Sequence, residues 1–290
     1  LFDSYNKESI SGLSSETVRE CLMKGGLWAS LKEYPFKNIP KQSTIPPAIY
    51  VSLEYDEPHM PSSKVILNEY ASEFAVGIDV LKQLTTNVYV SHSDKHPVEQ
   101  DNIKDLITHE IEGDYPANDP GIFLYYNKTK VSDNNSWGIQ ALDVIRIGQL
   151  FLSGTYPIER LMVIAGPLAK QPRHIKTREG TALSFIENEA TQSEPTRIIC
   201  GGVLTGKKAE IIDGIGYGDS AINIIREGQE QEMLTFFRPG FNKPTFSNTY
   251  LYAVTKSTKW AMTSSINGGH RACISCGLCT KVCPVDSSPQ

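Results

Sequence analysis

The sequence lacks any apolar run long enough to cross a membrane. Its most apolar stretch, Leu161 to Ala169, has only the length of a strand, whereas a membrane-spanning helix needs roughly 20 apolar residues. Concentrated positive charge is lacking too, because 28 Lys and Arg are scattered among 33 Asp and Glu, for a net charge of −5. Binding to a nucleic-acid backbone requires clustered positive charge, so no nucleic-acid partner is expected.

Paired histidine ligands are also missing, because none of the six histidines has a spacing such as H-E-x-x-H. Solvated or packed histidines are therefore expected. The chain begins at Leu1 without an initiator Met and ends at Gln290, and we interpret it as a segment of a longer protein. With 290 residues and 40% hydrophobic content, it is long enough to bury a substantial core in two domains.

Cysteine is scarce, yet four of the six cysteines lie in one run near the C-terminus. Cys273, Cys276, Cys279 and Cys283 have the spacing C-x2-C-x2-C-x3-C and are followed by Pro284, which is typical of the iron–sulfur run of bacterial ferredoxins. A zinc site and a disulfide cluster are the alternatives. Zinc ligands usually come from two separated pairs, and disulfides require an oxidising compartment, whereas this pattern favours a reducing, cytoplasmic one.

The cysteine run by itself provides an incomplete ligand set. In two-cluster ferredoxins the fourth cysteine of such a run binds the other cluster, and this sequence contains no second run. We therefore expect Cys273, Cys276 and Cys279 to lie on a turn that holds three corners of a [4Fe–4S] cluster, with Cys283 pointing elsewhere. Such a cluster is expected to be incomplete or empty in this segment.

The first half of the chain has the periodicity of an α/β domain. Ser14 or Ser15 begins a helix that ends at Gly25-Gly26. Three strands and two later helices are then predicted in an alternating order that favours a parallel sheet. The predicted strands are 48–55, 87–92 and 121–126, and the predicted helices are 72–84 and 136–154.

After Gly154 the predicted elements are short strands separated by Gly, Pro and Asp-Gly turns. They cover residues 159–166, 181–189, 197–206 and 221–228, and predict a small, mostly β module. The expected organisation is an N-terminal linker (1–19), an α/β domain (20–155), a β domain (156–245), and a connector with the Cys-rich segment (246–290).

Three stretches, taken in order, resemble the family of A-type subunits of the Na+-translocating NADH:quinone reductase, or Nqr complex. They are GLSSETVRECLMKGGLWASLKEYPFKNIP, AGPLAKQPRHIKTREGTALSFI and SSINGGHRACISCGLCTKVCPVD. The C-type subunit of the Rnf electron-transport complex and the flavin-binding subunit of respiratory complex I belong to related families. The resemblance implies a Rossmann-like α/β domain followed by a small β-grasp (SLBB-type) domain, with a C-terminal Cys-rich segment.

The resemblance also implies a function. It implies a peripheral subunit on the cytoplasmic face of the bacterial inner membrane, docked on membrane-embedded and peripheral subunits of the same complex. That enzyme passes electrons from NADH to ubiquinone and translocates sodium, and this chain alone is not expected to be catalytic.

The sequence departs from the flavin-binding relative where a cofactor would be held. A long Gly-rich run after the first helix is replaced by Gly25-Gly26-Leu27-Trp28-Ala29-Ser30-Leu31, and glycine is what allows backbone to approach a flavin phosphate closely. The segment Leu53–Pro58 is interpreted as an acidic turn, with a residual ligand site as the alternative. Gly214–Gly218 is interpreted as a turn rather than a phosphate loop. Neither FMN nor NADH is expected on this chain.

Two further expectations concern docking and electron transfer. Trp28, Tyr34 and Phe36 are candidates for a quinone or partner surface, because aromatic residues are enriched there; ordinary core packing is the alternative. For function, we favour a docking and quinone-proximal subunit whose ancestral flavin site is lost. The alternative is an iron–sulfur electron-carrying subunit of an Rnf-type membrane complex.

Overall fold

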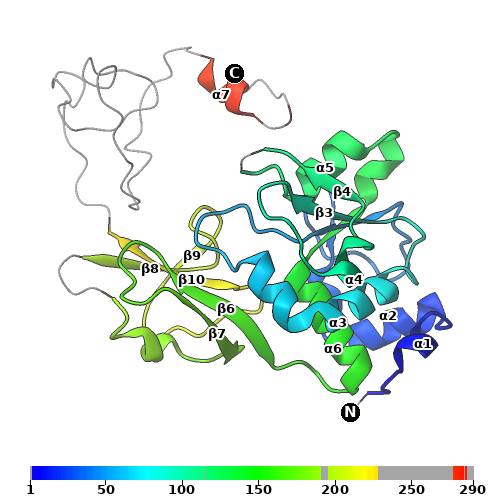
Figure 1. Cartoon of the computed structure of the whole chain (residues 1–290), viewed down its shortest axis with the longest axis horizontal. Helices are drawn as coiled ribbons and strands as arrows, with labels where there is room; N and C mark the ends of the chain where they lie inside the picture. The colour runs from blue at the N-terminus through cyan, green and yellow to red at the C-terminus, as the bar shows by residue number, and fades with distance from the viewer. Residues whose placement is uncertain (1, 114, 191–194, 228–276, 284, 286–290) are drawn as a thin grey trace.

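A five-stranded sheet forms in the first half of the chain (Figure 1). The computed structural model describes residues 2–113, 115–190, 195–227, 277–283 and 285. The strand order is β1-β5-β2-β3-β4, and every neighbouring pair is parallel except β1 with β5. The strands are β1 (Lys32–Glu33), β2 (Ile49–Ser52), β3 (Val88–Ser93), β4 (His109–Ile111) and β5 (Trp137–Gln140). This parallel sheet confirms the predicted Rossmann-like α/β architecture.

Helices cover both faces of this sheet. Successive side chains of a strand point to opposite faces, so Ile49 and Val51 of β2 join the large core, whereas Tyr50 joins a smaller core with Phe123 and Leu124 of α5. The helices are α1 (Lys7–Ile10), α2 (Ser15–Lys24), α3 (Ser63–Leu81), α4 (Asp101–Lys104), α5 (Pro120–Asn127) and α6 (Ala141–Ser153). The short 3-10 helices are η1 (Trp28–Ser30) and η2 (Val131–Asn135).

Local sequence signals explain where several helices begin and end. The Ser14 side chain accepts a hydrogen bond from the backbone N–H of Thr17 at 3.1 Å, as expected for an N-cap. At the other end of the α/β half of the chain, α6 ends at Gly154, whose φ is +63°. Glycine adopts this left-handed conformation easily because it has no Cβ to clash with the backbone. The predicted helix starts and stops at these two positions are confirmed.

Three predicted elements are wrong. Residues 121–126 were expected as a strand but belong to α5, because Asp119 caps the helix through the N–H of Gly121 and Pro120 occupies its first position. Residues 136–154 form β5 and then α6 instead of one helix. Residues 181–189 contain the 3-10 helix η3 (Leu183–Ile186) and no strand. Short apolar runs fit either kind of element, so periodicity alone does not separate them.

A second five-stranded sheet follows α6. Its order is β7-β6-β10-β8-β9, with β6 and β10 parallel and the other pairs antiparallel. Its own small core contains Met162, Ile164, Leu183, Ile222 and Ile224. The strands are β6 (Glu159–Ala165), β7 (Arg173–Arg178), β8 (Thr196–Cys200), β9 (Lys207–Ala209) and β10 (Ala221–Arg226).

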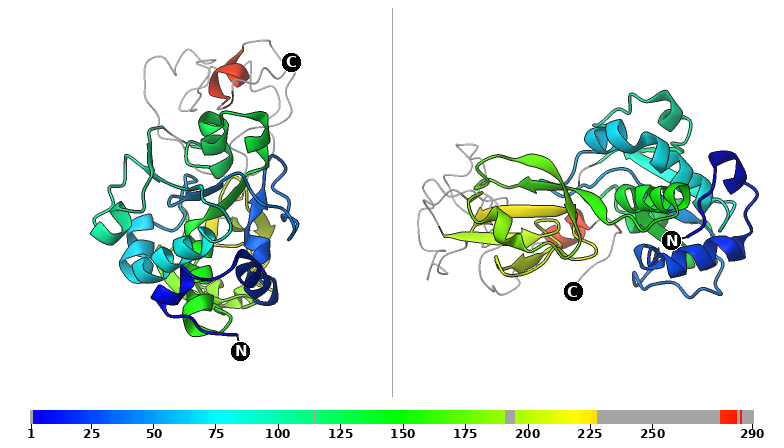
Figure 2. Two further views of the ribbon diagram at one scale, coloured as in Figure 1. Left: turned by 90° about the vertical axis from the view of Figure 1, so that its right-hand side faces the viewer. Right: turned by 90° about the horizontal axis from the view of Figure 1, so that it is seen from below.

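We call residues 2–153 the first module and residues 159–227 the second module, and Figure 2 shows them side by side. The segment expected as an N-terminal linker contains α1 and the start of α2, and Ile10 is fully buried in the core of the first module. Among the helices that the structure describes, none is both long and apolar enough to span a bilayer.

Candidate ligand pocket between the two modules

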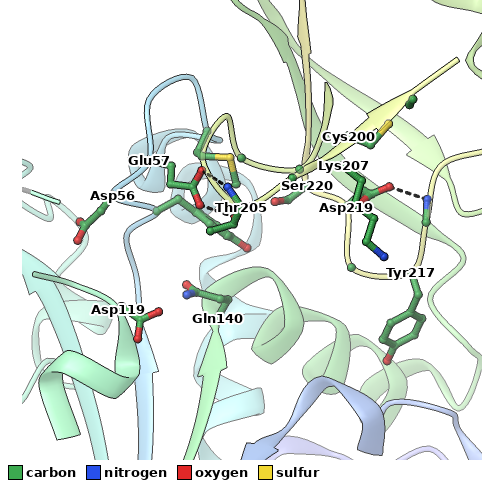
Figure 3. A pocket seen from close by; sticks show the side chains of 18 of the residues that line it. Asp56, Glu57, Asp119, Gln140, Cys200, Thr205, Lys207, Tyr217, Asp219 and Ser220 are labelled. Atoms are coloured by element: carbon green, nitrogen blue, oxygen red, sulfur yellow. Dashed lines mark hydrogen bonds between the residues drawn. The ribbon is translucent and has the colours of Figure 1, made fainter. Parts of the chain in front are cut away.

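The carboxyl ends of β2 and β5 lie beside a cavity of about 920 Å³ between the modules. The chain adds β3 and β4 on one side of β2, and β5 pairs on the other side, so the strand order changes direction between β2 and β5. Open α/β sheets bind ligands at such a switch point. Figure 3 shows the side chains that surround the cavity, with Gln140 below and Thr205, Lys207 and Asp219 above.

Glu57, in the loop after β2, connects the two modules across this cavity. Its carboxylate accepts hydrogen bonds from the backbone N–H groups of Leu204 and Thr205, at 2.8 and 3.3 Å. The Thr205 hydroxyl donates a third hydrogen bond to it, at 2.5 Å. A Cβ on Gly202 would lie 2.0 Å from the nearest Glu57 oxygen, so only glycine leaves room for the carboxylate.

The neighbouring acid has a different partner. Asp56 accepts hydrogen bonds from the backbone N–H and the side-chain amide of Asn118, at 2.5 and 2.8 Å. Asn118 is buried, with 2% of its surface exposed, and follows the cis peptide bond between Tyr115 and Pro116. Asp56 and Glu57 of the acidic segment after β2 therefore bind donors of the protein itself. The turn that was expected over Leu53–Pro58 is present only at the end of that segment, from Pro58.

Two more carboxylates that line the cavity also have partners. Asp119 forms an ion pair with Lys37 at 2.9 Å, and Asp219 accepts a hydrogen bond from the N–H of Gly216 at 2.8 Å. The loop containing Gly216 leads into β10 and opens no helix, so the expected turn at 214–218 is confirmed and a dinucleotide fingerprint is not present there.

Burial changes the pKa of two residues that line the pocket, Cys200 and Glu54. Burial raises the pKa of the Cys200 thiol to about 11, so the thiol is neutral at pH 7 and a poor nucleophile. Burial also raises the pKa of the Glu54 carboxyl, opposed by a hydrogen bond with Ser63 and by two nearby histidines.

A second contact zone, centred on Arg146 of α6, joins the modules beside the pocket. The Arg146 guanidinium lies 2.6 Å from a carboxylate oxygen of Glu179 and donates a hydrogen bond to the Tyr156 hydroxyl at 2.7 Å. It also lies 5.0 Å from the centre of the Tyr217 ring. Arg160 shares Glu179 from the second module, at 3.2 Å.

The three aromatic candidates do not share one surface. Trp28 is 4% exposed, donates a hydrogen bond to the Pro40 carbonyl, and packs edge-on against Trp137. Tyr34 is 7% exposed and fits against Gly121 and Gly138. Only Phe36 is exposed, at 81%. The core-packing alternative therefore describes Trp28 and Tyr34.

The structure describes half of the cysteine run. Cys279 lies in α7 (Leu278–Val282), and Cys283 directly follows this helix. Neither forms a disulfide, and Cys279 is exposed. Cys273 and Cys276 lie outside the described residues, and no cluster of three or more metal-binding side chains occurs among the residues that are described. Four thiols at this spacing fit the donor set of an iron–sulfur cluster.

The sequence did not reveal the pairing of Glu57 with the turn at 202–205. The acidic turn and the glycine-containing segment 201–206 are both visible in the sequence, but they lie about 150 residues apart. The one available signal was the pair Gly201-Gly202 directly after a strand, which indicates a close backbone approach.

Comparisons with known families agree with the order of the modules. A family described as the NqrA second alpha/beta domain matches residues 13–156, and one described as the NQRA C-terminal domain matches residues 162–210. A family described as a 4Fe-4S binding domain matches residues 270–287.

Curated full-length relatives carry the name of the same family. The chain is 32% identical to the A-type subunit of the Na(+)-translocating NADH-quinone reductase of Histophilus somni (strain 2336). It is 31% identical to the proteins of the same name from Vibrio parahaemolyticus and Pasteurella multocida. Each alignment covers 99% of this chain and 65% of the relative. The chain thus spans about 65% of the length of these curated relatives.

Among solved structures, an NAD+-reducing [NiFe]-hydrogenase in the H2-reduced state is similar, with a TM-score of 0.52 and 10% sequence identity. The similarity covers 75% of this chain and 48% of the hydrogenase chain. At this level of identity it shows a shared fold and carries no further information about activity.

Proposed function

This chain belongs to the NqrA family, as its sequence resemblance predicted, and on that premise we propose that it acts within a Na+-translocating NADH:quinone reductase. Its role there is to dock on the other subunits and to lie near the quinone, without binding FMN or NADH. The complex would use ubiquinone as its electron acceptor and lie at the cytoplasmic face of the bacterial inner membrane. The chain would be a peripheral subunit of it.

The packing of the segment after α2 is the observation that supports the loss of the flavin site. A flavin phosphate needs exposed backbone N–H groups and no side chains in the way. Here Leu27, Trp28 and Leu31 are buried in the core of the first module, and Trp28 packs against Trp137 of β5. Apolar side chains therefore fill the place that a Gly-rich loop would leave open.

A titration with FMN and with NADH tests this part of the proposal. Neither should bind the chain at micromolar concentration, followed by the quenching of flavin fluorescence and by calorimetry. Micromolar binding of either one would overturn the lost-site interpretation. A Trp28→Gly variant serves as the comparison, because it restores glycine at this position without touching the pocket between the modules.

The docking role is tested on the exposed loop that contains Phe36. Phe36, Ile39 and Ile45 are 81%, 55% and 76% exposed within one short segment, and exposed apolar side chains mark interaction sites when they gather. Changing Phe36 to Ser should weaken co-purification with the other subunits or reduce labelling by a photoreactive quinone analogue in the assembled complex. Val131→Ser, at an equally exposed site, is the matched control. Equal behaviour of the two variants would contradict a docking role for this loop.

The match to a 4Fe-4S binding domain at residues 270–287 favours a second candidate function. In it, the chain carries electrons through an iron–sulfur cluster, as a component of an Rnf-type complex would. Cys273, Cys276, Cys279 and Cys283 would hold the cluster, which would accept and release one electron at a time.

Anaerobic reconstitution separates the two candidates. After incubation with iron and sulfide, the electron carrier should contain both elements in stoichiometric amounts and show the visible absorbance of a cluster. Cys279→Ser should lose them, whereas Cys21→Ser, outside the run, should not. Binding of zinc or formation of disulfides by the four cysteines would instead identify the run as structural.

A further inference from the structure

The turn that receives Glu57 has the chemistry of an anion-binding site. Two backbone N–H groups, of Leu204 and Thr205, and the Thr205 hydroxyl point at one carboxylate. Successive backbone N–H groups in a turn form a concave site that favours anions. Hydrogen bonds from such donors to an ionised acceptor are stronger than neutral ones.

A positively charged residue follows the turn directly in the sequence. Lys207 begins β9, directly after the turn, and lines the same cavity, as Figure 3 shows. It forms no ion pair with any residue in the part of the chain that the structure describes. Lys208 lines the cavity as well. The turn therefore offers aligned donors, and two lysines line the cavity that contains it, together with carboxylates such as those of Asp213 and Asp219.

The anion that occupies this turn comes from the other module. Glu57 follows β2 of the first module and reaches Thr205 across a sequence separation of 148 residues. Gly202 leaves the space that the carboxylate fills, because a Cβ there would lie 2.0 Å from it. An external anion can enter the turn only by displacing Glu57, and this would release one of the contacts that hold the modules together at the pocket.

We propose that the turn at residues 201–207 is a binding site for a small anionic group, a carboxylate or a phosphate, and that Glu57 occupies it from within the chain. Binding of an external anion and attachment of Glu57 then exclude one another. Because Glu57 is tethered, it competes at a high effective concentration and weakens the apparent affinity of the native turn for external anions. This proposal goes beyond the proposed function and does not depend on it.

Removing the internal occupant is the direct test. In Glu57→Ala, inorganic phosphate should bind at least about tenfold more tightly than in the native chain, measured by calorimetry, since the competing carboxylate is gone. Acetate, titrated in parallel, distinguishes a turn that accepts carboxylates from one that prefers phosphate. The double variant Glu57→Ala with Thr205→Val removes a donor and should lose the gain.

A matched control distinguishes the effect of emptying the turn from the effect of removing a negative charge from the cavity. Asp119→Asn removes one negative charge from the same cavity, leaves Lys37 without its partner, and keeps an N-cap residue on α5. Its phosphate affinity should therefore rise much less than that of Glu57→Ala, because Glu57 still occupies the turn. Glu57→Leu, which has no acceptor oxygen and a similar size, provides the same comparison if Glu57→Ala does not fold. Amide hydrogen exchange at Leu204 and Thr205 should quicken in the Glu57 variants and slow again when phosphate is added. Phosphate binding in the Glu57 variants no tighter than in Asp119→Asn, with no protection of these two amides, would overturn the proposal.

Discussion

Arg146 provides a demanding test of how the modules are joined. Its side chain is 3% exposed, and its guanidinium lies 2.6 Å from Glu179 of the second module and 3.6 Å from Asp143 of its own helix. Replacing it by Met keeps much of the volume but leaves two acids without their shared partner. Breaking a buried ion pair in this way costs about 3–5 kcal/mol.

The structure places the expected loss near the lower end of that range. Glu179 keeps Arg160 as a second partner at 3.2 Å, and its side chain is 21% exposed. We therefore expect Arg146→Met to lower the free energy of unfolding by about 3 kcal/mol. The matched control is Arg178→Met, because Arg178 pairs with Glu159 at 3.4 Å with both side chains about 60% exposed. An exposed pair of this kind contributes about 0–1 kcal/mol.

Urea unfolding, followed by circular dichroism and by tryptophan fluorescence, measures the difference. The three tryptophans include Trp28 and Trp137 of the first module, so fluorescence reports mainly on that module. A transition that is single in the native chain and splits in Arg146→Met would show that Arg146 couples the modules. Equal losses below about 1 kcal/mol in both variants would refute the reasoning, because Arg146 would then behave as an exposed residue.

Further predictions concern the helix crossing and acid stability. A Cβ on Gly148 of α6 would lie 1.9 Å from the Glu73 carbonyl oxygen of α3, so Gly148→Ala should destabilise the chain by about 1–3 kcal/mol in spite of the better helix propensity of alanine. Gly12→Ala is the control: a Cβ there would lie 3.6 Å from the nearest atom, so it should be nearly neutral in the same urea assay. A Gly148→Ala variant that is more stable than the native chain would contradict the close crossing of α3 and α6. Backbone N–H groups in its own turn lower the pKa of Asp133 below the usual value of 3.8. Its contribution is therefore present above about pH 4 and is lost as the pH falls through the lowered pKa, so the stability difference between the native chain and Asp133→Asn should vanish in acid; a difference that is independent of pH would refute this origin.

Local residue chemistry was sufficient to predict some elements and insufficient for others. Ser14 caps α2 and Gly154 ends α6 because each requirement involves only neighbouring backbone groups. The helix at 120–127 was missed, although Asp119 and Pro120 carry its start signal, because six successive apolar and aromatic residues also suit a buried strand. Its identity depends on how it packs against Tyr50 of β2.

The sequence by itself determined the family, the order of an α/β module and a β module, and the spacing of the four cysteines. Each of these features depends on motifs or periodicities of residues that are close along the chain. Only the tertiary structure decided which aromatic side chains are buried, since Trp28 meets Trp137 across more than 100 residues. It also decided that Glu57 ends in a turn of the other module. The first of these pairs lies inside the core of the first module and the second joins the two modules. Both depend on how elements distant in the sequence pack together, which no local pattern specifies.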